Sequence, residues 1–190
     1  MRSPLLIGAA LALTLYFIVL YNGLVGLKHS VAKAWANIDV LLKQRHDEIP
    51  KLVEVCKQYA QFEQQTLLKV MEARNAVASS SAAHDAARLG ASEGLLRRGI
   101  AQLNAVAEAY PELKANEQFS QLSRRISALE DSIADRRELY NEAVNLNNMR
   151  IEQFPDLLIA RLFGFAGAHP LRFESHETCD VDVSSLFRQP

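Results

Sequence analysis

The densest group of side chains able to do chemistry lies where a long apolar N-terminal segment gives way to polar sequence. This His46 cluster consists of Asp39, Arg45, His46, Asp47 and Glu48. Carboxylates and imidazoles ligate zinc and carry protons in hydrolases. The spacing lacks the HExxH pattern, so helix caps and ion pairs are the favoured interpretation. A metal-dependent hydrolase site is the alternative.

Two further groups contain reactive residue types. The C-terminal tail carries the potential zinc ligands His169, His176, Glu177, Cys179 and Asp180. Their spacing fits no closed zinc pattern, which favours a solvated tail.

The serines at 79–81 precede His84 and Asp85, which together are the residue types of a catalytic triad. No nucleophile elbow surrounds these serines, and no glycine-rich phosphate loop occurs in the chain. Because 79–85 also lacks a periodic apolar face, a surface loop is predicted there. The sequence therefore predicts a protein that is not an enzyme, with no catalytic residue, no metal site and no cofactor.

Composition excludes other classes. The chain has 190 residues, with 21 Lys and Arg against 22 Asp and Glu, giving a formal charge of −1. Without a basic field, no nucleic-acid partner is expected. Two cysteines, Cys56 and Cys179, make no disulfide framework, and Cys56 falls on a helical apolar stripe that predicts a core position.

The elements that must position these groups begin with an anchor. Residues 3–27 carry no charge, and the run LLIGAALALTLYFIVL is long enough to cross a hydrocarbon core of ~30 Å. A cleaved signal peptide is the rival, but no A-x-A-like site follows the run. A retained transmembrane helix is favoured. Arg2 stands before it and Lys28, Lys33, Lys43 and Arg45 follow, which favours an outside N-terminus and a cytoplasmic domain at an inner membrane.

Helical periodicity continues beyond the anchor. The membrane helix is predicted to run on to about His46, and a second helix to run from about Ile49, with Pro50 in its first turn, to Ala78. Further helices are expected over 92–110, 119–154 and 156–163, the last capped by Gly164. The fold class is thus all-α, divided into a transmembrane anchor (1–27), a helical bundle (28–164) and an irregular tail (165–190).

Polar residues interrupt the stripe of the 119–154 helix at Arg136 and Asn147. Such residues either fix the register of an oligomer or lie at the edge of a wide face. Arginine pairs at 97–98, 124–125 and 136–137 indicate solvated faces, with contacts to anionic lipid as the alternative.

The order of residues is specific from Tyr21 to Arg74, which includes the stretch KAWANIDVLLKQRHDEIP. The match resumes at Tyr140-Asn141, Phe154-Pro155, Phe163-Gly164-Phe165 and Phe173-Glu174. In these blocks the chain resembles the LemA family of membrane proteins, although Glu48, Lys51 and Phe62 depart from its usual pattern. The resemblance implies one membrane-spanning helix joined to an antiparallel bundle of long helices, and it implies no enzymatic activity.

The expected function is a membrane-anchored bundle that self-associates as a scaffold organising or remodelling membrane, with lipid and further copies of the chain as partners. The alternative is an adaptor that recruits an enzyme or protease through the tail at 165–190, with Phe173 and Leu186-Phe187 as docking residues.

Overall fold

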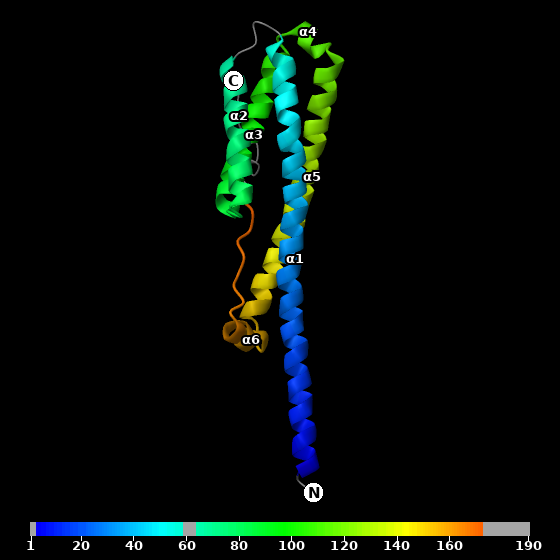
Figure 1. The fold of residues 1–190 in the computed structure, drawn as a ribbon, viewed down its shortest axis with the longest axis vertical. Helices are drawn as coiled ribbons and strands as arrows, with labels where there is room; N and C mark the ends of the chain where they lie inside the picture. The colour runs from blue at the N-terminus through cyan, green and yellow to red at the C-terminus, as the bar shows by residue number, and fades with distance from the viewer. Residues whose placement is uncertain (1–2, 59–63, 173–190) are drawn as a thin grey trace, which may run out of the picture.

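The computed structural model describes residues 3–58 and 64–172, and the described residues form six helices and no strand. The longest helix, α1 (Ser3–Lys57), projects alone from the bundle at its N-terminal end and forms one wall of the bundle at its C-terminal end (Figure 1). At 55 residues it is ~82 Å long.

The bundle consists of two antiparallel helix pairs. Helix α5 (Glu117–Glu152) packs along α1, and α2 (Gln64–Ala82) packs along α3 (Ala86–Ala107). The short α4 (Pro111–Lys114) joins α3 to α5 at the end far from the N-terminus, and α6 (Asp156–Phe163) lies at the opposite end beside α1 (Figure 1). The all-α prediction is confirmed.

Apolar side chains at steps of three and four fill the interior. Ile49 of α1, Leu103 of α3 and Ile126 of α5 are each at most 1% exposed. Cys56 is fully buried as predicted, and burial raises the pKa of its thiol to about 12, so the thiol stays protonated. Cys179 lies outside the described residues.

The C-terminal helices follow the predicted bounds closely. Helix α5 begins where the Asn116 side chain accepts a hydrogen bond from the Phe119 backbone N–H, at 3.0 Å. Helix α6 ends at Gly164, which adopts φ 68° in the left-handed region that glycine tolerates best.

The predicted break near His46 is wrong, because α1 continues through Pro50 to Lys57. Proline has no N–H, so the carbonyl four residues earlier, that of His46, loses its helical partner. Arg74 of α2 replaces that partner, with its Nε donating to the His46 carbonyl at 2.8 Å. A contact between helices thus allows a proline that would otherwise end α1.

The predicted loop at 79–85 is also wrong in its first half. Ser80 and Ser81 lie in the last turn of α2 and are buried. The chain turns at His84, with φ 53°, and Asp85 caps α3 by accepting from the Arg88 N–H at 3.0 Å. Helix α3 consequently starts six residues before the predicted Ser92 and ends before Tyr110.

Candidate functional site

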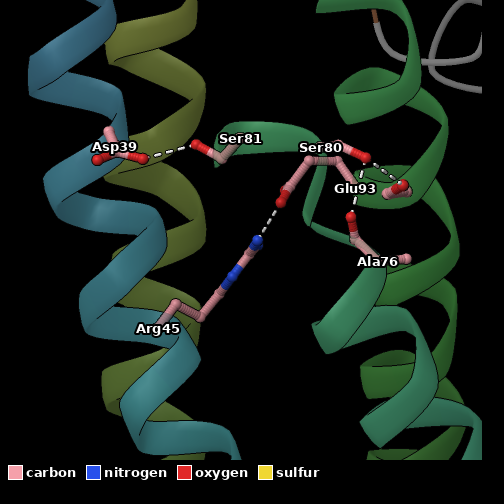
Figure 2. Close-up of polar contacts among 7 residues, drawn as sticks. Asp39, Arg45, Ala76, Ser80, Ser81 and Glu93 are labelled. Carbon is pink, nitrogen blue, oxygen red and sulfur yellow. Dashed lines mark hydrogen bonds and ion pairs between the residues drawn. The ribbon is translucent and has the colours of Figure 1, made fainter. Parts of the chain in front are cut away.

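Polar side chains from several helices meet between the helices of the bundle, with Asp39 at the exposed edge of the group (Figure 2). We call this the polar layer, and its members are Asp39, Arg45, Ser80, Ser81, Ser92, Glu93 and Glu130. Arg45 of α1 is 2% exposed and Glu93 of α3 is 4% exposed, and the two form a buried ion pair. The Arg45 Nε is buried with no hydrogen-bond partner among the described residues, so the ion pair offsets only part of the cost of taking the two charges out of water.

The serines of α2 complete the polar layer on one side. Ser81 donates its hydroxyl to the Asp39 carboxylate at 2.6 Å. Ser80 donates to the Ala76 carbonyl at 2.9 Å, and its hydroxyl lies 3.4 Å from that of Ser92. The serine run therefore ties α2 to α1 and α3.

Glu130 of α5 faces the same interior. Its Oε1 is buried with no hydrogen-bond partner in the described part of the chain. Burial raises the pKa of the Glu130 carboxyl, the positive charges of Arg45 and Arg97 oppose that rise, and Glu93 adds to it. The direction shows that the charged form of Glu130 is disfavoured in the folded state.

A Glu130→Gln variant is expected to become more stable than the parent protein as the pH rises. Because the pKa of Glu130 is higher folded than unfolded, its contribution to stability is complete at low pH and is lost as the pH rises through the folded pKa. The variant should unfold at a higher temperature than the parent at pH 8, by about 2–4 °C for each kcal/mol regained. At pH 4 the difference should shrink toward zero. Thermal scans of the detergent-solubilised protein, followed by circular dichroism, check this, and a difference that does not change with pH would contradict it.

The residues of the His46 cluster do not converge on one site. The carbonyl of His46 binds Arg74, and burial together with the charge of Arg74 lowers the pKa of its imidazole. Asp47 is exposed. Glu48 is buried between Lys51, at 3.2 Å, and Arg125, at 3.3 Å. His46, Asp47 and Glu48 therefore have separate surroundings and form no common site.

The geometry supports neither a triad nor a metal site among the described residues. Ser81 already donates to Asp39, while the His84 ring stacks on Trp35 with ring centroids 5.3 Å apart. No group of three or more His, Cys, Asp or Glu side chains in 3–58 and 64–172 is placed to hold a metal ion. In the tail, His169 is exposed, and the other proposed ligands lie outside the described residues.

The polar interruptions of the α5 stripe have different environments. Arg136 is exposed, whereas Asn147 is 4% exposed. Of the arginine pairs, Arg125 bonds Glu48, and Arg97 faces the polar layer.

Residues 165–172 run along α5 in extended form, and we call this segment the strap (Figure 1). Two asparagines one heptad apart each hold one strap residue by both backbone groups. Asn148 accepts from the Ala168 N–H at 2.9 Å and donates to its carbonyl at 2.8 Å. Asn141 does the same with Leu171, at 2.7 Å and 3.1 Å.

Further contacts fix the strap to the bundle. Tyr140 donates its hydroxyl to the His169 carbonyl at 3.0 Å, and Asn147 reaches the Ala166 carbonyl at 3.5 Å. Leu171 is 1% exposed and belongs to the main core. The hydrogen bonds go to the backbone of the strap and not to its side chains, whereas Leu171 is also held by its buried side chain. Sequence reasoning missed this function of Asn141, as it missed Glu93 and Glu130.

Together, the single apolar helix that leaves the bundle and the long helices behind it define a membrane-anchored all-α protein. The apolar window of α1 has a mean hydropathy of 1.9, and only 11% of it is buried. A core helix of a soluble protein would be mostly buried, so the exposed window indicates contact with lipid.

The chain belongs to the LemA family, whose model matches residues 34–184. It is 27% identical to a protein named LemA from Metamycoplasma hominis over 165 residues, which is 87% of this chain and 74% of that protein. Two magnetosome proteins, MamQ 1 and MamQ 2 of Paramagnetospirillum magneticum, are each 29% identical over 103 residues. That match covers 54% of this chain but only 38% of either MamQ protein. None of these names carries an enzyme activity.

Proposed function

We propose that this protein is a non-enzymatic scaffold, whose copies associate in the inner membrane and organise or remodel it. The observation that carries the proposal is the continuity of α1, which runs from the apolar window to Lys57 without a break. A rigid connection of this kind transmits contacts between bundles to the membrane, since no flexible linker intervenes. The relatives named as magnetosome proteins support a role at membranes.

The contact surface we propose lies on the outer face of α5 and α1. Leu139, Leu146 and Met149 of α5 follow a heptad-like spacing and are 44–49% exposed. A shallow groove continues this surface toward the membrane, and it is lined by Gly23, Leu27, Leu146 and Met149 together with the polar Arg150 and Gln153. Apolar residues at such spacing pack well against the same stripe of a second copy.

We place the N-terminus outside and the bundle in the cytoplasm, on the positive charges of Lys28 and Lys33 that follow the span. Arg45 supports this orientation less than the sequence implied, because its charge is neutralised inside the bundle.

The test is the particle size of the full-length protein in mild detergent, measured by light scattering and electron microscopy. Large regular particles are expected, and Leu146→Glu should reduce them to monomers or dimers because it places a charge in the proposed contact. Leu68→Glu is the matched control on α2, where Leu68 is 61% exposed but outside the stripe, and its particles should keep their size. A monomeric parent protein would overturn the scaffold proposal and favour an adaptor that captures a partner through the tail.

A further inference from the structure

Helix α6 presents a row of large apolar side chains to its surroundings. Leu158 and Leu162 of α6 lie four residues apart and are 56% and 76% exposed, and Phe154, in the turn just before α6, is 79% exposed. Phe163 beside them is 59% exposed. Residues four apart share one helix face, so Leu158 and Leu162 form an apolar surface on α6, with Phe163 and Phe154 at its two ends. An exposed apolar surface of this kind marks a site of contact with lipid or with another protein.

The position of α6 is fixed by contacts with α1. Ile159 and Ala160 of α6 pack against Leu20 and Leu24 in a small core of their own. The ring of Tyr21 adds edge-to-face contacts, with its centroid 4.9 Å from that of Phe163 and 5.8 Å from that of Phe165. The height of α6 along α1 is therefore that of residues 20–24.

The thickness of a bilayer places its surface at this same height. Every described side chain of α1 before Leu20 is exposed, and this stretch of ~16 residues is only ~24 Å long. A hydrocarbon core of ~30 Å needs ~20 residues. Arg2 limits the core on one side and Lys28 on the other, so the acyl chains must extend past Leu20 and reach the level at which α6 packs.

The charges of α6 suit a helix at a membrane surface. The Asp156 carboxylate is 4% exposed and lies 3.1 Å from Arg150, so it faces away from lipid with a cation beside it. Arg161 is exposed, and its long side chain can extend to lipid phosphates while its stem remains near the acyl chains. Tyr21 has the polar tip and apolar body common at this level.

We propose that α6 is an interfacial membrane helix: Phe154, Leu158, Leu162 and Phe163 insert into the acyl-chain boundary of the same bilayer that α1 crosses. The bundle is then attached to the membrane at two points, and its tilt is fixed. This inference rests on the membrane-spanning role of α1 and not on self-association, so the particle-size experiment can fail without affecting it.

Tryptophan quenching in lipid vesicles tests the depth of α6. The full-length protein, carrying Leu162→Trp, is reconstituted into phosphatidylcholine–phosphatidylglycerol vesicles with or without bromine on the acyl chains. Because interfacial helices bury their apolar face by ~5–10 Å, bromine should reduce the fluorescence of the added tryptophan by about two-fold or more. The parent protein, whose one tryptophan is the buried Trp35, supplies the background signal.

Leu139→Trp is the matched control. Leu139 is also an exposed leucine, but it lies ~20 Å along α5 from the helix end at Glu152, away from α6. It should show no quenching beyond the parent, and Leu158→Trp should behave as Leu162→Trp does. All three sites are on the surface, so folding should be preserved, and circular dichroism verifies it. Equal quenching at 162 and 139 would overturn the proposal. So would an unquenched but blue-shifted tryptophan at 162, because a second copy would then cover the α6 face.

Discussion

Replacing Arg45 with methionine is expected to lower the free energy of unfolding by about 3–5 kcal/mol. Methionine has a similar volume, so the interior stays filled, but the Glu93 carboxylate is left buried without its cation. Glu130, whose carboxyl already has a raised pKa, also loses a nearby positive charge. Chemical denaturation of the full chain in mild detergent, followed by circular dichroism, measures the loss.

Two comparisons distinguish the cost of leaving a buried charge unpaired from the cost of losing an ordinary surface ion pair. Arg88→Met removes an exposed pair, 3.3 Å from Asp85 with Arg88 81% exposed, and should cost no more than about 1 kcal/mol. The double variant Arg45→Met/Glu93→Leu removes both buried charges and should recover most of the stability, since apolar replacements of a buried pair are often neutral. An Arg45→Met variant as stable as Arg88→Met would contradict the assignment.

The parts of the fold that periodicity and caps determine were predictable. Helix α5 keeps its apolar steps over 36 residues, and the bounds of α6 follow from Pro155 before it and Gly164 after it. These signals are local, so no knowledge of neighbouring helices is needed. Family resemblance then added the antiparallel arrangement.

The continuation of α1 through Pro50 could not be predicted from local rules. Those rules place a proline in a first turn because an interior proline leaves a carbonyl unpaired. The carbonyl of His46 is paired here by Arg74, which is 28 residues away in the chain. Which arginine reaches that carbonyl depends on how α2 packs against α1.

The sequence could have indicated the buried positions of the polar layer but not how they pair. Arg45 lies between Leu42 and Ile49 at inward spacing, and Glu93 lies between Leu89 and Leu96 in the same way. A charge within an apolar stripe is the signal that could have found them, since such a charge needs a partner in the core. The pairing itself follows from the relative heights of α1 and α3, which the sequence does not encode locally.

The strap has no sequence signature of its own. Residues 165–172 lack a helical or alternating pattern, and the division into a bundle at 28–164 and a tail at 165–190 remains a prediction. Its attachment depends on side-chain amides of α5. In the sequence alone, Asn141 and Asn148 resemble solvated surface residues, because nothing there shows that an extended segment lies beside them.

Gly90→Ala is expected to destabilise the protein, although the same change in an open helix stabilises by about 1 kcal/mol. A Cβ on Gly90 would lie 2.0 Å from the Arg172 carbonyl oxygen, at the end of the strap. That oxygen is backbone and cannot rotate away, so the end of the strap must move. Moving it exposes Leu171 and breaks its two bonds to Asn141. We expect a net loss of about 1–3 kcal/mol.

Gly26→Ala is the matched control for this prediction, because a Cβ on Gly26 meets nothing within 4 Å, and its stability should be unchanged or higher. Limited proteolysis supplies a second readout, because trypsin cuts after Arg172 only when the surrounding backbone can leave the surface of α3. Cleavage there should be faster in Gly90→Ala than in the parent and unaffected in Gly26→Ala. If Gly90→Ala raises the unfolding free energy and leaves cleavage unchanged, the strap does not close over α3 at Gly90, and the extra methyl acts only through helix propensity.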